Sequence, residues 1–142
     1  MRFMIIRRAD KETEAGMMPS GELLAAMMKY NEEMVNAGVM LAGEGLKPSA
    51  HGARVKFSNG KPVITDGPFA ETKELIAGYS MIQVKSMQEA LEWVQRWPSI
   101  DAHGEVELEI RPLLEAEDFG DAFTPEMQAQ EDRLRAHTGG KP

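Results

Sequence analysis

The spacing of apolar positions changes several times along the chain, and each spacing predicts a different element. Residues 3–7 and 76–84 carry apolar side chains at both odd and even positions, which is typical of a strand that is covered on both faces. Residues 22–36 and 87–97 repeat apolar side chains every three or four positions, as an amphipathic helix does. We therefore expect two central strands and two helices.

Shorter patterns complete the order of elements. Residues 39–42 resume as a strand, and residues 53–57 and 62–65 are joined by Asn59-Gly60, a pair that favours a type I′ hairpin turn. Residues 105–111 alternate strictly and predict the last strand. Ser20 is the expected N-cap of the first helix, and Ser86-Met87-Gln88-Glu89 matches a capping box before the second.

This order, strand-helix-strand-hairpin-strand-helix-strand, predicts an α+β fold. It fits a ferredoxin-like antiparallel sheet with both helices on one face. Because two helices cover only one face, the apolar side chains on the other face of the central strands would form a large exposed patch. We therefore expect a homodimer in which two sheets pack face to face and enclose a cavity.

Composition limits the classes of function. The 142 residues suit one domain, expected at 1–114, followed by an acidic tail at 115–142 with a helical signal from Pro125 to Arg135. The net charge of −7 disfavours nucleic acid as a partner. The chain has no cysteine and no apolar run of membrane-spanning length, so we expect a cytoplasmic protein without a membrane partner. Its three histidines have no metal-ligand spacing, and we expect neither a metal nor a cofactor.

Candidate chemistry is concentrated in two places. The run from Asp66 to Glu74 places charged side chains around Gly67-Pro68, and the last strand places Glu109 and Arg111 on one face. These charges either form solvated ion pairs or line the enclosed cavity, where a carboxylate beside a guanidinium could bind an anion or position a proton donor. His103 precedes the last strand as a candidate general base beside a carboxylate, although a loop histidine more often has no chemical role.

Individual residues of the central run also allow two interpretations. Asp66 can hydrogen-bond its own turn or take part in a site. Phe69 can be a hydrophobic anchor or line a pocket mouth, and Lys73 and Glu74 can be a solvated pair or a site pair. The expected catalytic residues are Asp66, His103 and Glu109, and the expected substrate-binding residues are Phe69, Lys73, Glu74 and Arg111.

The run Asp66-Gly67-Pro68-Phe69, with the flanking sequence 63–74, Gly78-Tyr79 and the closing segment 103–112, resembles the YCII-related family, specifically its DGPF branch. The resemblance spans roughly residues 2–114. It implies a dimeric α+β barrel, a fold shared with cofactor-independent muconolactone isomerases and with heme-type or quinone-forming monooxygenases. The shorter branch of the family pairs a first-helix histidine with an aspartate, but residues 22–36 contain no histidine, so that pair cannot be carried over.

The resemblance leaves two functions open. The first is a small-molecule enzyme, a lyase or isomerase that transfers protons through Asp66, His103 and Glu109. The second is a non-catalytic dimeric module that binds a ligand or a regulatory protein, because members of the DGPF branch are often encoded near, or fused to, extracytoplasmic-function sigma factors. Turnover of a bound metabolite favours the first, and binding without turnover favours the second.

Overall fold

The structure is a computed structural model that describes residues 1–139, and it divides into two compact units. The first unit is Met1–Pro112 and the second begins at Leu113. The division expected from the sequence, 1–114 and 115–142, stays a prediction, because compactness does not show that either part folds alone. No helix within residues 1–139 is long and apolar enough to cross a membrane.

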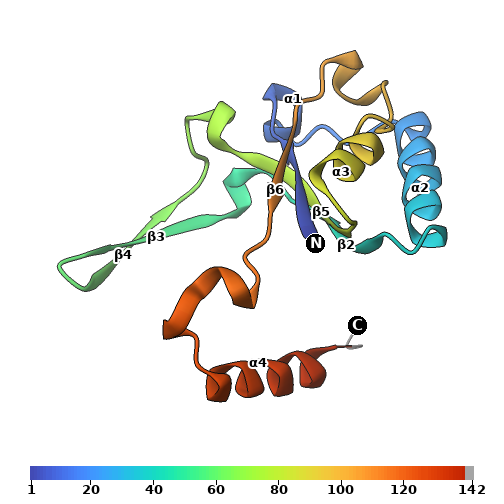
Figure 1. Ribbon diagram of the computed structural model, residues 1–142. Coiled ribbons are helices and arrows are strands. Elements are labelled where there is room, and N and C mark those ends of the chain that lie inside the picture. Colours follow the sequence, from blue (N-terminus) through green and yellow to red (C-terminus); the bar gives the residue numbers. More distant parts are fainter. Residues whose placement is uncertain (140–142) are drawn as a thin grey trace. The chain divides into compact units, whose positions relative to one another are not determined.

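The first unit is an antiparallel four-stranded sheet with two main helices on one face (Figure 1). The strands lie in the order β2-β5-β1-β6, so the two central strands are those that the sequence predicts. This is the ferredoxin-like arrangement, and the expected fold class is confirmed. The elements of the sheet layer are β1 (Arg2–Arg8), β2 (Met40–Gly45), β5 (Ile76–Gln83) and β6 (Leu108–Pro112), with α2 (Gly21–Asn36) and α3 (Met87–Val94) as the helices.

Short elements connect this framework. They are α1 (Lys11–Glu14) and the single 3₁₀ turns η1 (Ser49–His51), η2 (Thr72–Glu74) and η3 (Asp101–Gly104). In the second unit, η4 (Ala116–Ala122) precedes α4 (Pro125–Thr138), which forms where the acidic tail carries its helical signal. The remaining strands, β3 (Ala53–Ser58) and β4 (Lys61–Asp66), form a separate two-stranded hairpin.

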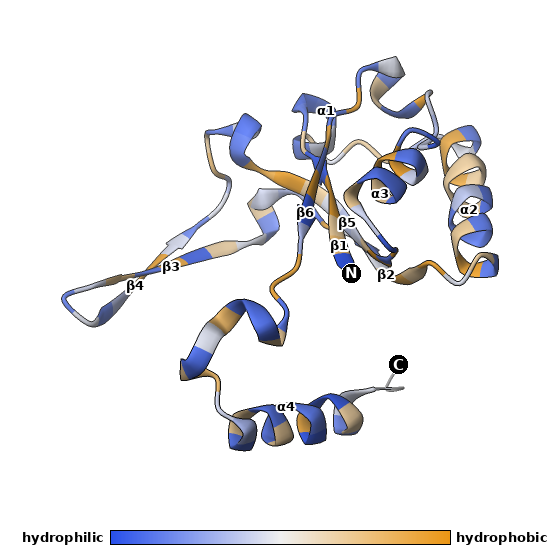
Figure 2. Ribbon diagram, in the orientation of Figure 1, coloured by the Kyte–Doolittle hydropathy of each residue, from blue (hydrophilic) through white to orange (hydrophobic). Residues whose placement is uncertain are grey.

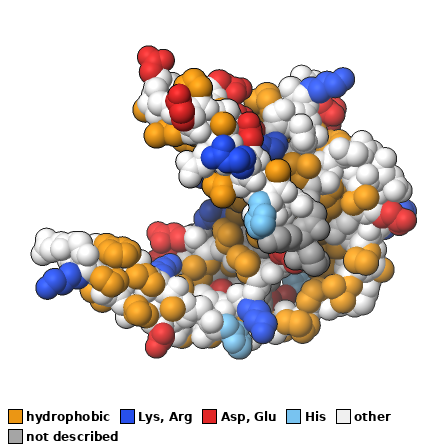
Figure 3. Space-filling view, turned by 90° about the horizontal axis from the view of Figure 1, so that it is seen from below, with side chains coloured by type: hydrophobic (Ala, Val, Ile, Leu, Met, Phe, Trp, Pro, Cys, Tyr) orange, Lys and Arg blue, Asp and Glu red, His pale blue; other side chains and the backbone are white. Residues whose placement is uncertain are grey.

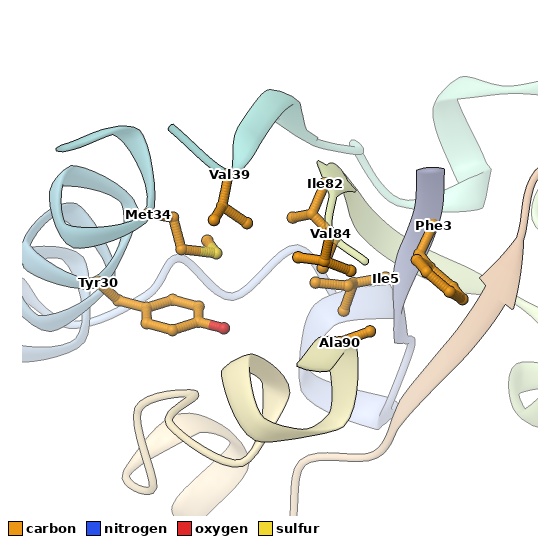
Figure 4. Packing of buried hydrophobic residues seen from close by; sticks show 8 residues of the cluster. All are labelled: Phe3, Ile5, Tyr30, Met34, Val39, Ile82, Val84 and Ala90. Carbon is orange, nitrogen blue, oxygen red and sulfur yellow. The ribbon is translucent and has the colours of Figure 1, made fainter. Parts of the chain in front are cut away.

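The core lies between the sheet and the two helices, and we call this side of the sheet the helix face (Figure 4). Phe3, Ile5 and Ile82 are fully buried there, and Phe3 pairs directly with Ile82 across β1 and β5. Tyr30 and Met34 of α2 pack onto them. Figure 2 shows the same distribution, because the central strands are among the most hydrophobic parts of the ribbon.

The opposite side of the sheet, here the open face, has no helix of the first unit on it (Figure 1). Its residues pair in rows across the strands, Met4 with Met81 and Ile6 with Tyr79. These side chains are partly exposed, whereas their neighbours on the helix face are buried. The strand pattern therefore indicates correctly that both faces of the central strands are apolar.

The hairpin projects away from the sheet layer and is exposed throughout (Figure 1). Its turn residues, Asn59 and Gly60, have φ of 51° and 77°, as a type I′ turn requires. Figure 3 shows hydrophobic side chains gathered along this arm, at the left of the view. The exposed apolar residues of the hairpin are Val55, Phe57, Val63 and Ile64.

Several local predictions were wrong. The last strand begins at Leu108 rather than at residue 105, because residues 102–104 adopt left-handed backbone conformations and interrupt the extended chain. At the start of α3, Ser86 accepts the backbone N–H of Glu89, but the Glu89 carboxylate bonds the backbone of Lys85 instead of closing the box on Ser86.

The first helix is amphipathic as expected, but fewer of its apolar side chains are buried than the pattern offers. Tyr30 and Met34 are buried, whereas Leu24, Met28 and Val35 are 52%, 70% and 59% exposed. The helix packs on the core along one line of residues, Tyr30 and Met34, with Met27 partly buried beside them. The helix nevertheless begins after Ser20, whose hydroxyl accepts the Leu23 N–H, and ends before Gly38 with φ of 71°.

Candidate active site on the helix face

A cavity of about 1150 Å³ lies on the helix face, beside the packed core. Its floor is formed where β2 pairs with β5, at Gly43 opposite Ser80 and Gly45 opposite Gly78. None of these residues has a side chain larger than a hydroxymethyl group, so the helix face of the sheet is left empty here. On β1, by contrast, side chains such as Ile5 fill the corresponding space. A methyl group on Gly78 would lie 2.9 Å from the Glu44 carbonyl oxygen, so the close approach of the two strands also requires glycine.

The walls come from three segments that the fold brings around this floor. They are the N-terminal half of α2 with the chain before it, the segment after β2, and the loop from Trp97 to Gly104. Most of the wall side chains are apolar. These are Met17, Met18, Pro19, Leu23, Leu24, Met27, Met40, Leu46, Pro48 and Ile100. The cavity therefore resembles a small-molecule site, which is mainly apolar with a few placed polar groups.

One buried ion pair lies at the edge of the cavity. The Arg7 guanidinium donates to both carboxylate oxygens of Asp101, at 2.7 and 3.3 Å, and the Trp97 indole N–H donates to Asp101 at 2.9 Å. Arg7 also donates to Asp10 at 3.2 Å. The side chains of Arg7 and Asp101 are 12% and 6% exposed, so the pair is shielded from water.

The protonation of this pair follows from its contacts. Burial alone would raise the pKa of Asp101, but the hydrogen bonds from Arg7 and Trp97 outweigh it and hold that pKa below its ordinary value. Burial alone would likewise lower the pKa of Arg7, and the contact with Asp101 raises it instead. Both groups therefore stay charged, and Asp101 is too tightly held to accept a proton from a substrate near neutral pH.

Asn31 provides a second polar group, on α2. The residue lines the cavity, and its side-chain oxygen Oδ1 is fully buried with no hydrogen-bond partner among the described residues. Such an orphaned acceptor costs free energy, because water is removed from it without replacement. The oxygen has no accessible surface, so this unsatisfied acceptor is not exposed to the cavity.

His103 lies at the rim of the cavity and is paired with a carboxylate. Its Nε2 lies 3.0 Å from both carboxylate oxygens of Glu12, and the imidazole is 80% exposed. The carboxylate predicted beside this histidine is thus Glu12, from the start of the chain, and not the neighbouring Asp101. Ala102 and His103 have φ of 53° and 57°, a strained conformation for residues with a side chain, and Gly104 continues it at 87°.

The DGPF run lies elsewhere and follows the hairpin within the first unit. The backbone N–H of Gly67 donates to Gly52, and the N–H of Phe69 donates to the Ser49 hydroxyl, each at 3.0 Å. A methyl group on Gly67 would lie 1.7 Å from the Ser49 carbonyl oxygen, so this glycine is needed for close approach and not for a positive φ, which it does not have. The Arg54 guanidinium stacks on the Phe69 ring at 3.8 Å.

Two of the remaining predicted residues, Glu109 and Arg111, are on the open face, opposite Ile6 and Met4 of β1. Glu109 lies 3.3 Å from Arg8 and 3.4 Å from Arg111, and Arg8 also donates to the backbone carbonyl of Lys73. Asp66 and Glu74 are exposed. Of the seven residues proposed from the sequence, His103 alone lines the cavity on the helix face, and Glu109, Arg111 and Lys73 form a second group around Arg8.

A comparison with models of protein families matches the YCII-related domain over residues 1–114. The chain belongs to the YCII-related family. This YCII-related protein is also 34% identical, over 96 residues, to an uncharacterised protein of Rhizobium meliloti (strain 1021); the match covers 65% of this chain and 70% of the relative. The matched family domain contains the whole helix-face cavity and the DGPF run.

Among solved structures, the YCII-related chain is similar to 5-chloro-2-hydroxyhydroquinone dehydrochlorinase from Burkholderia phenoliruptrix AC1100, solved with 2,5-dihydroxybenzoquinone. The identity is 14% and the TM-score 0.47, with 83% of this chain and 98% of the other covered. At that level of similarity the fold assignment depends on the strand order of this chain, described above.

The cavity residues that the sequence analysis missed include Arg7, Glu12, Asn31 and Asp101. Arg7 had a usable signal, because it shares its strand parity with Phe3 and Ile5 and should therefore face the core. A buried arginine requires an acid. Nothing in the sequence indicates which acid, because Asp101 lies 94 positions away.

Proposed function

We propose that this protein is a small-molecule enzyme of the lyase or isomerase class, which transfers a proton within the helix-face cavity. The observation that supports this most directly is the pairing of His103 with Glu12 at the rim of a mainly apolar cavity of about 1150 Å³. An imidazole that is oriented by a carboxylate can accept and return a proton near neutral pH. A cavity of this size can hold a molecule large enough to place a reacting atom beside the ring.

We assign different roles to the polar groups of the cavity. His103 is the proposed base, and Glu12 holds its ring and stabilises the imidazolium. Arg7 and Asp101 are positioning residues: together with Trp97 they fix the start of the segment that carries His103. Asp66 and Glu109, the other catalytic residues expected from the sequence, do not line this cavity, and Glu12 replaces them in the proposal.

We also propose that the protein is a cytoplasmic homodimer of the DGPF branch. The motif Asp66-Gly67-Pro68-Phe69 supports the branch, and the absence of cysteine from the sequence is compatible with a reducing compartment. The partly exposed apolar rows of the open face support a second copy as their cover. In that assembly Glu109 and Arg111 would face the partner, where they could still line a chamber that binds an anionic substrate together with Phe69, Lys73 and Glu74.

Turnover by single-residue variants tests the proposed function. A metabolite library is screened by thermal shift, and each stabilising compound is followed by NMR for conversion. We expect His103→Gln to lower kcat about 100-fold or more without loss of fold, since general base catalysis contributes about that factor. We expect Glu12→Gln to lower kcat less, because the imidazole keeps its place but loses the carboxylate that orients it.

His51 provides a matched control, because it is exposed and does not line the cavity. His51→Gln should therefore leave turnover unchanged. Full activity of His103→Gln would refute the proposed base. Tight binding without conversion would instead favour the non-catalytic module, which binds a ligand or a regulator of the sigma-factor type.

A further inference from the structure

One polar group on the floor of the helix-face cavity has no partner. Ser80 lies opposite Ile5 across β1 and β5, so its side chain is on the helix face, and the residue is only 5% exposed. Its hydroxyl forms no hydrogen bond within residues 1–139, and unlike the Asn31 oxygen it keeps accessible surface at the cavity. A buried hydroxyl needs a partner, and here only water or a ligand in the cavity can provide one.

The neighbouring strand leaves this hydroxyl open to the cavity. Gly43 of β2 is the residue paired with Ser80, and a methyl group on it would lie 3.4 Å from Ser80 Oγ. The Met40 side chain reaches toward the same position, with its Cε 2.5 Å from that methyl group. Because a methionine side chain is flexible, a ligand atom can displace it and reach the hydroxyl.

The charged groups nearest to the floor are already paired with each other. Arg7 donates to Asp101 through Nε and Nη2 and to Asp10 through Nη1. Glu12 lies against His103 at the rim. An ionised ligand group would have to break one of these pairs to obtain a partner of opposite charge.

The other charged residues of the lining do not change this result. Glu22 and Lys47 are exposed, so water screens their charges. Glu44 pairs with Tyr79 on the open face, the face opposite to the cavity. A ligand group that is charged would therefore lose water in the cavity without gaining a free counter-charge, whereas an uncharged oxygen needs only one hydrogen bond.

The walls indicate the rest of the ligand. Leu23, Met27 and Ile100 are among the apolar side chains that surround the floor. A hydrocarbon body against them gains affinity in proportion to the apolar area that it removes from water. A serine hydroxyl both donates and accepts, so it can bond the oxygen of a ketone or of an alcohol.

We propose that the helix-face cavity binds an uncharged, mainly hydrocarbon molecule whose ketone or alcohol oxygen is hydrogen-bonded to Ser80 Oγ. This inference rests on the proposed function, and it names the class of substrate and the residue that selects it. It requires binding only, so it can be tested without knowing the reaction.

The test uses four probes with one rigid skeleton and different polar groups: adamantanone, adamantanol, adamantylamine and adamantanecarboxylate. Binding to the full chain is measured by NMR titration at neutral pH, where the amine and the acid are ionised. We expect the ketone and the alcohol to bind about fivefold or more tightly than either ion, because only the ions lose a charge-stabilising shell of water. Equal or tighter binding of either ion would overturn the proposal.

A single variant locates the contact. Ser80→Ala should weaken binding of the ketone and the alcohol about fivefold, because it removes one hydrogen bond between uncharged groups. Ser58→Ala is the control, since Ser58 ends β3, is exposed and does not line the cavity. Unchanged affinity of Ser80→Ala for both neutral probes would refute the contact.

The stability of the same variant provides a second readout. Because no described residue bonds the hydroxyl, Ser80→Ala should leave the denaturation midpoint unchanged or raise it. A clearly lower midpoint would show that the hydroxyl has a structural partner, and this would also contradict the proposal.

The result is separable from the outcome for the proposed function. His103→Gln should still bind adamantanone, because the imidazole is not part of the Ser80 contact. If His103→Gln keeps full turnover, the proposed base is refuted while selective binding through Ser80 stands. If Ser80→Ala binds the neutral probes as the unchanged protein does, this inference is refuted and the role of His103 is unaffected.

Discussion

The two faces of the sheet are built from the same strands, yet they differ in what covers them. Ile5 and Ile6 are neighbours on β1, and Ile5 is fully buried while Ile6 is partly exposed. The ion pairs follow the same division: the Arg7–Asp101 pair on the helix face is shielded, and Glu109 on the open face is paired while 39% exposed. Similar residues therefore contribute differently to the stability of the fold, and coverage by the helices determines how much each contributes.

Truncation of the two isoleucines should give the largest difference. Ile5→Ala should lower the free energy of unfolding by about 3–4 kcal/mol, because it leaves a cavity in a packed core, and Ile6→Ala by about 1 kcal/mol. Chemical denaturation at a concentration where the chain is monomeric measures both. Equal losses in the monomer would contradict the difference between the faces, whereas a loss for Ile6→Ala that grows with protein concentration would support the homodimer.

Removal of one acid from each face should give the next largest difference. Asp101→Asn should cost about 3 kcal/mol, because Arg7 stays buried with a weaker partner, and Glu109→Gln should cost about 0.5 kcal/mol or less. Denaturant midpoints compare the two variants. The double change Arg7→Met with Asp101→Leu should recover part of the loss, since no uncompensated charge is left, and a larger loss in the double variant would contradict this account.

A glycine pair extends the comparison to the base of the hairpin. Gly67→Ala should destabilise the protein by about 2 kcal/mol, because the added methyl group meets the backbone of Ser49. Gly21→Ala is the control: nothing lies within 4 Å of the added atom, and alanine favours the helix. Thermal unfolding of both variants decides the matter, and an unaffected Gly67→Ala protein would show that the DGPF loop is free to move.

Acid titration should give the smallest effect. The pKa values of Asp101 and Asp10 are held below their ordinary values, so the folded state binds fewer protons there than the unfolded state does. Their contribution is therefore complete above the ordinary aspartate pKa of about 4 and is lost as the pH falls through the lower folded values. Denaturation curves at a series of acidic pH values give the free energy of unfolding at each pH. Asp101→Asn should make this free energy depend less on pH, and an unchanged pH dependence would contradict the assignment.

Much of the fold could be predicted from the sequence, because the patterns that define it are local. The double-sided strands, the caps and the Asn59-Gly60 turn depend on residues a few positions apart, and the order of elements then selects the sheet. The start of β6 could not be predicted, because residues 105–107 alternate as a strand does while the left-handed segment before them delays the pairing.

The candidate site was harder to predict, because it depends on contacts between distant parts of the chain. Glu12 and His103 are 91 positions apart, and the sequence suggested a carboxylate for His103 without indicating this one. The cavity itself depends on small residues on two strands, Gly43 and Ser80 among them, and a missing side chain leaves no pattern of its own. The DGPF run was the most visible motif, yet its described contacts are with Ser49, Gly52 and Arg54 and not with the cavity.

The left-handed backbone at Ala102 and His103 affects how far the protein must rearrange when a ligand binds. Such a conformation persists only where neighbouring contacts impose it, and here Asp101, clamped by Arg7 and Trp97, fixes the preceding residue. The free-energy cost of these unfavourable dihedral angles is thus met during folding and not during binding. The His103 backbone is therefore already positioned before a ligand binds, and binding should require little rearrangement of the cavity rim.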